Sequence, residues 1–239
     1  MVWYMIEQAI GERAFHIRDL RAIVIGDLHI GYEKELRDKG IIIPDQMKDM
    51  QRRVKMLIEK YNARRLIILG DLKHEIMGYT PQLRKFFEDL NDVEILLVKG
   101  NHDARIEEMV DIDVYPSEGF RMGDYGFIHG HSWPAENVMK AKYVFMGHLH
   151  PEIELEDSLW KKHRYACHLI GRLTEKGRER YGGNPRIFMV AAFNKLVGSA
   201  IAQPLGPLLH NELIGDFDVY LLDGTYLGKY AYTKSSDFY

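Results

Sequence analysis

Polar residues able to bind divalent metals recur in five short motifs along the 239-residue chain. In chain order the motifs are Asp27-Leu28-His29, Gly70-Asp71, Gly100-Asn101-His102-Asp103, His129-Gly130-His131 and Gly147-His148-Leu149-His150. They supply carboxylate oxygens, an amide oxygen and imidazole nitrogens, the mixed donor set that two neighbouring divalent ions require. Six of the eleven histidines fall within them. The series therefore predicts metal-dependent chemistry.

Two of the motifs place a pair of candidate ligands two residues apart. Side chains at positions i and i+2 of an extended segment point to the same side. Asp27 and His29 can therefore share one ion, and His148 and His150 repeat the arrangement. A glycine directly precedes the first ligand of four motifs, and glycine permits the sharp turns that bring ligands together.

Each motif directly follows a short apolar run, which we predict to be a strand. The runs are Ala22–Ile25, Leu66–Leu69, Ile95–Val98, Phe127–Ile128 and Tyr143–Met146. Between them, apolar residues recur at helical spacing in Pro44–Tyr61, and shorter segments of the same kind are Pro81–Leu90 and Ala104–Val110. Alternating strands and helices predict an α/β fold, in which ligands gather beyond the carboxyl ends of the strands.

The pattern changes after the last motif. Strand-like segments follow one another without clear helices between them, and they predict a second, largely antiparallel sheet packed on the first. They are Glu152–Leu155, Tyr165–Ile170, Arg186–Ala191, Phe217–Leu222 and Tyr226–Tyr232. We predict one domain over residues 1–239, with a motif-bearing α/β half at about 20–150 and a mostly β half at about 151–233.

Composition restricts the class of protein. The formal net charge is −3, so no strong overall field attracts nucleic acid or a membrane surface. Cys167 is the only cysteine, which excludes an internal disulfide and favours a reducing, cytoplasmic location. Met1–Gly11 has no signal-peptide pattern. Polar residues and prolines interrupt Ile187–Leu209, which we interpret as a buried strand followed by an apolar loop, and we expect no membrane contact.

The ordered motifs resemble those of calcineurin-like metallophosphoesterases, which follow the pattern D-x-H, GD, GNH[DE], H and GHxH. Gly26–Glu33, Gly70–Glu75, Ala192–Asn194 and Gly206–Leu209 are further similar to a subgroup of archaeal and bacterial phosphohydrolases. That subgroup includes enzymes described as DNA-ligase-associated nucleases. The resemblance implies a four-layer αββα sandwich with two mixed sheets flanked by helices, and a homodimer is compatible with it.

The resemblance also implies a ligand set. One metal would be held by Asp27, His29 and His150, and the other by Asn101, His129 and His148, with Asp71 bridging the two. Two divalent ions about 3.5 to 4 Å apart can hold a bridging hydroxide that attacks phosphorus in line. The donor set lacks thiolate and favours Mn²⁺, with Fe, Co, Ni or Zn as alternatives.

Four further residues of these motifs and their surroundings have predicted roles. His102 lies beside a ligand without being assigned to a metal, and we predict that it stabilises the transition state or acts as general acid, held by Asp103. A purely orienting role for His102 is the alternative. His131 is expected to line the substrate pocket. His74 either tunes the site or packs against it, and we assign it to the substrate side.

The substrate is less well determined than the chemistry. Seven Lys or Arg residues against two acids lie between Lys161 and Arg180, and Arg172, Arg178 and Arg180 are the candidate contacts to a phosphate backbone. A solvated basic surface is the alternative. We therefore predict a metal-dependent phosphodiesterase or nuclease acting on DNA or RNA. A phosphatase or phosphodiesterase of small nucleotides or phosphomonoesters, and a non-catalytic interaction scaffold, are the competing hypotheses.

Overall fold

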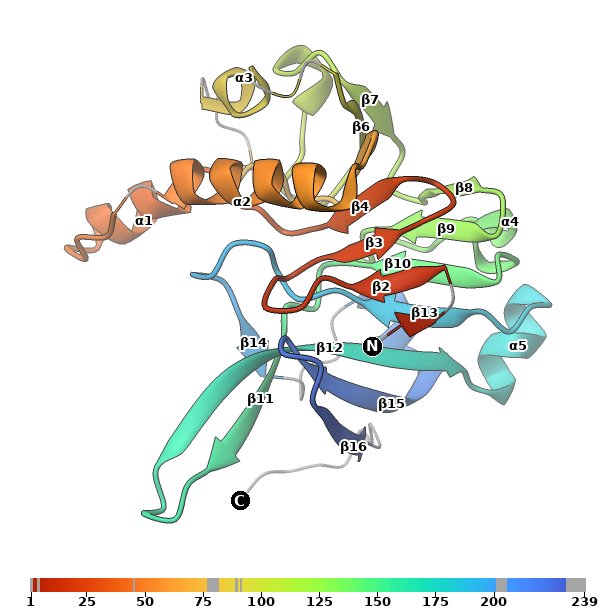
Figure 1. Ribbon diagram of the computed structural model, residues 1–239. Coiled ribbons are helices and arrows are strands. Elements are labelled where there is room, and N and C mark those ends of the chain that lie inside the picture. Colours follow the sequence, from red (N-terminus) through yellow and green to blue (C-terminus); the bar gives the residue numbers. More distant parts are fainter. Residues whose placement is uncertain are drawn as a thin grey trace.

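The computed structural model of the chain describes residues 2–3, 5–44, 46–76, 82–88, 90, 92–200 and 206–230. Two stacked sheets form the centre of the molecule (Figure 1). The first sheet has the order β1-β2-β3-β4-β5-β6-β7. Its strands are β1 (Val2–Trp3), β2 (Ile6–Gln8), β3 (Phe15–Ile17), β4 (Ala22–Ile25), β5 (Arg65–Ile68), β6 (Glu94–Val98) and β7 (Asp113–Tyr115). Strands β4 to β7 pair in parallel, so their carboxyl ends lie at one edge.

The second sheet has the order β14-β11-β12-β13-β10-β9-β8, and β15 joins it by pairing with β12 and β16. Its strands are β8 (Phe120–Met122), β9 (Tyr125–Ile128), β10 (Tyr143–Met146), β11 (Pro151–Glu156), β12 (Lys162–Leu173), β13 (Arg186–Met189), β14 (Ser199–Ala200), β15 (Ile214–Leu221) and β16 (Tyr226–Tyr230). Strands β9, β10 and β13 are parallel, and the other pairs are antiparallel except β11 with β14. The sheet is therefore mixed.

Helices cover the outer face of each sheet. Above the first sheet lie α2 (Gln46–Tyr61), which runs along the sheet, and α3 (Gln82–Phe87), whereas α1 (Tyr32–Asp38) lies beyond the left end of α2 (Figure 1). The helices α4 (Glu136–Met139), α5 (Glu175–Tyr181) and α6 (Gly206–His210) belong to the second sheet. Buried side chains of α2 and α3 pack in the outer core of the first sheet, and those of α4 and α6 pack in the outer core of the second.

Strict alternation of side chains explains the layers. In β4, Ile23 and Ile25 face the helix side, while Ala22 and Val24 face the core between the sheets. Strands β5, β6, β10 and β13 alternate in the same way, so both faces of each central strand are apolar and buried. Phe127, Phe145 and Phe188 meet within the inter-sheet core. The predicted αββα sandwich is confirmed.

Several predicted elements differ from the structure. Ala104–Val110 forms only a 3₁₀ turn at Ile106–Glu108, because Arg105 is left-handed at φ 55° and interrupts an α-helix. The expectation of no helices after residue 152 is wrong, since α5 and α6 lie there. The second sheet also begins earlier than expected, with β8 to β10. Of the predicted elements, residues 45, 81, 89 and 231–233 lie outside the described part of the chain.

No helix within the described residues is long and apolar enough to cross a bilayer.

His168 on β12 should make the fold acid-sensitive. Its ring is fully buried against Phe15, and its Nδ1 accepts a hydrogen bond from the Ala191 amide at 3.2 Å. Burial lowers the pKa of His168 to about 3. The unfolded chain therefore takes up the proton first, and the stability present above pH 6.5 is lost as the pH falls towards 3. Between pH 7 and 5 we expect His168 to contribute a loss of about 2 kcal/mol in unfolding free energy.

Urea unfolding at the two pH values checks this expectation. In His168→Gln the amide oxygen can still accept the Ala191 hydrogen bond but cannot titrate, so the acid-induced loss should shrink by the same amount. An equal loss in both proteins would contradict the assignment to His168.

Candidate metal centre

The five motifs meet at one edge of the sandwich. Three follow β4, β5 and β6 of the first sheet, and two follow β9 and β10 of the second. Because these strands are parallel within each sheet, their carboxyl ends converge. The centre therefore lies across the junction of the two sheets, and both sheets contribute side chains to it.

The loops that carry the candidate ligands have an unusual backbone. Five non-glycine residues adopt positive φ, namely Asp27 (57°), His29 (43°), Asp71 (51°), His148 (69°) and His150 (47°). Asp and His tolerate this region better than most residues, but it still costs energy. Such strain is typical of functional sites, where the surrounding structure holds the side chains in place.

The side chains form two groups that share Asp71. In the first group, candidate ligand atoms of Asp27, His29, Asp71 and His150 all lie within 4.8 Å of one another. In the second, those of Asp71, His129 and His148 do so, and Asn101 Oδ1 lies 3.1 Å from His129 Nε2. The structure thus brings together all seven residues predicted as metal ligands, with Asp71 between the two groups.

Backbone groups fix the orientation of these side chains. The amide of His148 donates to the Asp27 carboxylate at 3.1 Å, and the amide of His102 donates to Asp71 Oδ1 at 2.9 Å. His129 Nδ1 donates to the Leu69 carbonyl at 2.6 Å, which leaves its Nε2 directed at Asp71 at 3.5 Å. These hydrogen bonds restrict rotation of the Asp27, Asp71 and His129 side chains and direct their candidate metal-binding atoms towards one another.

Unpaired nitrogen atoms show that a cation fits this centre. The Nε2 atoms of His29 and His150 are buried and form no hydrogen bond, although carboxylate oxygens of Asp71 and Asp27 lie 3.5 and 3.1 Å away. Buried polar atoms are normally satisfied, and lone pairs that face carboxylates repel one another unless positive charge lies between them. The described residues fit two divalent ions.

The electrostatics agree with this arrangement. Burial lowers the pKa of His29 to about 4, and burial likewise lowers that of His148 to about 4. Both imidazoles are neutral at pH 7, as metal binding requires. Burial opposes charge on His129 as well, but the Asp71 carboxylate outweighs it and raises the pKa of His129 to about 9. Positive charge is thus favoured between His129 and Asp71.

Two glycines make room for the side chains of His129 and Asp71. A Cβ atom on Gly70 would lie 2.5 Å from His129 Nδ1, and one on Gly100 would lie 2.2 Å from Asp71 Oδ1. Gly70 also has φ 86°, which side chains rarely adopt. These motif glycines are therefore required by close approach.

His102 lies at the margin of the centre, with its ring 4.9 Å from that of His29. Its Nδ1 donates to the His74 carbonyl oxygen, so Nε2 is the atom left to exchange a proton. Our prediction that Asp103 holds this imidazole is wrong. The fully buried Asp103 carboxylate instead accepts from the backbone amides of Gly100, Leu72 and Lys73 at 2.9, 3.0 and 3.3 Å.

Asp103 therefore holds together two of the loops around the centre. Its three amide contacts join the loop after β6 to the loop after β5. Burial, followed by the charge of Asp71, raises the pKa of Asp103 to about 6.

The remaining predicted histidines flank the centre. The ring of His131 lies 5.1 Å from that of His129, and burial lowers its pKa to about 4. His74 lies on the opposite side, where it contacts His29 and Glu35. His74 and His102 line a pocket of about 450 Å³, whose wall also holds the carboxylates of Glu35, Asp38 and Glu75 and the ammonium group of Lys34.

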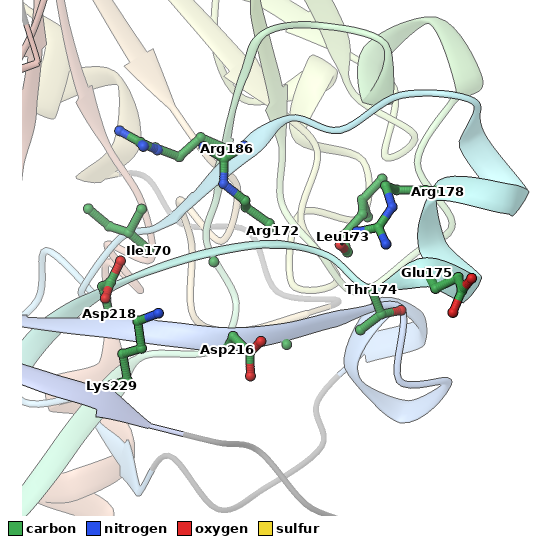
Figure 2. A pocket seen from close by; sticks show the side chains of 12 residues that line it. Ile170, Arg172, Leu173, Thr174, Glu175, Arg178, Arg186, Asp216, Asp218 and Lys229 are labelled. Carbon is green, nitrogen blue, oxygen red and sulfur yellow. Dashed lines mark hydrogen bonds between the residues drawn. The ribbon is translucent and has the colours of Figure 1, made fainter.

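The structure does not bring Arg172 and Arg178 to the centre. Arg172 pairs in register with Arg186, which begins β13 beside the start of β10, whereas the metal motif follows the end of β10. Since β12 runs antiparallel to β13, the end of β12 that carries Arg172 lies at the opposite edge of the sheet. Figure 2 shows both arginines in a separate pocket, where Asp216 and Asp218 also lie.

The basic segment is not a continuous stripe. Lys162 forms an ion pair with Glu154 of β11 at 2.9 Å, and Arg164 lies 3.7 Å from the same carboxylate. Arg180 differs, because its guanidinium stacks 4.0 Å above the ring of Trp133. Trp133 belongs to the loop that carries His129 and His131, and 41% of it is exposed. Of the three arginines, Arg180 alone contacts a loop of the metal centre.

One supporting residue has no assigned role in the sequence-based predictions. The amide side chain of the fully buried Asn194 donates to the Leu28 carbonyl at 2.9 Å, between Asp27 and His29. Arg13 and Arg53 in turn donate to backbone carbonyls of residues 192–194. The resemblance at Ala192–Asn194 is the sequence signal that could have identified this support.

Comparisons with known proteins agree with the geometry. A nuclease MPE from Pseudomonas putida has a similar structure, with 19% identity, a TM-score of 0.59 and 90% of each chain covered. The phosphoesterase Yfce from E. coli shares 16% identity at a TM-score of 0.42, with 89% of this chain and 99% of that chain covered. No curated protein matches the sequence. The family model described as calcineurin-like phosphoesterase matches residues 20–189, and the chain belongs to that family.

Proposed function

We propose that this protein is a dinuclear-metal-dependent phosphodiesterase that cleaves DNA or RNA. The observation that carries the proposal is the complete double cluster around Asp71, with His102 beside it. The family consists of phosphoester hydrolases, and a site without missing donors argues against a non-catalytic scaffold. As part of the proposal, we assign to this chain the nuclease activity for which the P. putida protein is named.

The residues divide into two ligand sets and one proton-transfer group. Asp27, His29 and His150 would hold one ion, and Asn101, His129 and His148 the other, with Asp71 shared. When bound, two divalent ions supply charge neutralisation for the phosphate and an activated water for in-line attack. His102 Nε2 gives a hydrogen bond or a proton to the phosphate or its leaving oxygen, because Nδ1 is occupied by the His74 carbonyl.

Trp133 and Arg180 support a nucleic-acid substrate. A base can stack on the exposed part of the Trp133 ring, and the Arg180 guanidinium, which covers one face of that ring, attracts the backbone phosphate. Three carboxylates against the single cation of Lys34 line the pocket at His102. This excess of negative charge would repel a long polyanion on that side, and so favours the second candidate, a hydrolase of small nucleotides or phosphomonoesters. Substrate size decides between these two functions.

The donor atoms and Cys167 bear on the native metal and on the cellular compartment. We propose Mn²⁺ as the native ion, because nitrogen and oxygen donors without thiolate suit it, with Fe, Co, Ni or Zn as alternatives. Cys167 is free and buried, which suits a reducing cytoplasmic compartment. Burial raises its pKa to about 12, which argues against a nucleophilic role. A homodimer stays a prediction.

The first test compares bis-p-nitrophenyl phosphate with p-nitrophenyl phosphate in the presence of Mn²⁺. We expect the diester to be preferred, and a short single-stranded oligonucleotide to be cleaved under the same conditions. Trp133→Ala should raise KM for the oligonucleotide and leave KM for the small diester unchanged, since only the former reaches the loop surface. Preference for the monoester would favour the second function, and no hydrolysis with any of the five metals would contradict both.

A further inference from the structure

Glu35, His74 and His29 form a chain of contacts that ends at the first ligand group. Glu35 Oε2 lies 2.5 Å from His74 Nε2, and His74 Nδ1 lies 3.4 Å from His29 Nδ1. His29 then directs its Nε2 at Asp71, 3.5 Å away. Neither Glu35 nor His74 belongs to the ligand groups that share Asp71. The chain therefore connects helix α1, outside the centre, with an ion-binding imidazole inside it.

The geometry points to one proton arrangement along this chain. When the Nε2 lone pair of His29 binds a cation, a neutral His29 carries its hydrogen on Nδ1. His74 Nδ1 faces that hydrogen and must accept it, so the hydrogen of His74 lies on Nε2 and is donated to Glu35. We propose that His74 and Glu35 are positioning residues that fix the tautomer and ring orientation of His29, an inference that rests on the proposed dinuclear function.

Neighbouring contacts hold both positioning residues. The His74 ring packs against the Tyr32 ring at 4.6 Å and stacks with the His102 ring at 5.5 Å. On α1, the buried Glu33 accepts the Gln46 amide at 2.7 Å and so fixes this helix to the start of α2. Lys39, one turn beyond Glu35, forms an ion pair with it. Glu35 thus reaches His74 from an anchored helix.

His74 also connects the ligand group with the proton-transfer group. Its side chain contacts His29, while its backbone carbonyl accepts from His102 Nδ1. Removal of the imidazole should therefore disturb His29 and leave the backbone support of His102 in place. Candidate ligand atoms of His29, His74 and His102 also lie within 4.8 Å of one another, so a third ion at this position is the competing explanation.

Metal affinity tests the proposal without a substrate. Titration calorimetry of metal-free protein with Mn²⁺ should show two sites in the wild type. In His74→Ala one site should weaken about 10- to 100-fold, the usual effect of removing the partner of a metal-binding histidine. Glu35→Leu should weaken the same site to a smaller extent, because the Glu35 side chain is 41% exposed. The second site should keep its affinity in both variants.

His163 provides a matched control. It also pairs with a carboxylate, Asp157 at 2.8 Å, but lies in the β11–β12 hairpin that extends from the body of the molecule (Figure 1). His163→Ala should leave both affinities unchanged. If His74→Ala does not fold, Glu35→Leu carries the same test from the surface of α1. Unchanged affinity in the folded variants, or three Mn²⁺ ions in the wild type and two in His74→Ala, would overturn the proposal.

Nitrogen-15 spectra of the Zn²⁺-loaded protein give a direct second readout. The expected tautomers are Nδ1–H for His29 and Nε2–H for His74, and a hydrogen on His74 Nδ1 would exclude the proposed chain. Both measurements are independent of turnover. A protein with the expected affinities and tautomers but no hydrolysis would contradict the proposed function alone.

Discussion

Replacement of Asp71 by Asn is expected to abolish metal-dependent hydrolysis. Asp71 is the one residue shared by both ligand groups, and an amide provides neither the charge nor the two equivalent oxygens that bridging requires. The paired ions contribute several kcal/mol of transition-state stabilisation. A loss of about 4 kcal/mol corresponds to a fall of about 10³-fold in kcat/KM. The fall in kcat/KM is measured from hydrolysis of bis-p-nitrophenyl phosphate by both proteins at saturating Mn²⁺.

Thermal unfolding gives an independent readout for Asp71→Asn. A ligand that binds only the folded state raises Tm, so Mn²⁺ should stabilise the wild type after chelator treatment and should not stabilise the variant. Asp216→Asn is a matched control, because Asp216 also has a positive φ of 52° but lines the separate pocket of Figure 2. An Asp71→Asn protein that retained Mn²⁺-induced stabilisation and activity would contradict the bridging role.

Replacement of His102 by Ala is expected to lower kcat about 10²- to 10⁴-fold, the usual contribution of general acid catalysis. Mn²⁺ affinity should stay within about threefold of the wild type, because His102 belongs to neither of the ligand groups that share Asp71. Steady-state kinetics and calorimetry on the same preparation separate the two quantities.

The choice of leaving group identifies the chemical role of His102. A general acid matters most when the departing oxygen is strongly basic, so the defect should be larger for a dinucleotide than for a p-nitrophenyl diester. An equal defect for both substrates would assign His102 to stabilisation of phosphate charge. If Mn²⁺ affinity fell in parallel with kcat, His102 would instead act through the metal ligands.

The strands that carry the motifs could be predicted because their apolar runs are short and end at polar motifs. Ala22–Ile25 and Tyr143–Met146 agree with β4 and β10 at both ends. Helix α1 could not be predicted in this way, since Glu33 is its one buried residue and no apolar stripe marks it. Strands β1 to β3 are two or three residues long, too short for a periodic pattern.

The motifs identified the residues of the centre from the sequence, whereas the hydrogen-bond partners of those residues depend on tertiary structure. Sequence adjacency suggested that Asp103 holds His102, but the turn directs its carboxylate to the backbone amides of Gly100, Leu72 and Lys73. The pairing of Glu35 with His74 joins residues 39 positions apart. Basic residues that are close in the sequence are far apart in space, because β12 carries Arg172 to the far edge of its sheet.

The candidate metal centre lies where the two sheets meet, so its ligands are added in two stages as the chain is synthesised. Asp27, Asp71 and Asn101 follow strands of the first sheet, while His129, His148 and His150 follow strands of the second. A growing chain therefore lacks three of the seven candidate ligands until the strands of the second sheet that precede them have been made, and the last of the three is His150. Each ligand group takes residues from both sheets. Neither ligand group can therefore form from strands of one sheet, and we expect a chain truncated before His129 to bind no pair of ions.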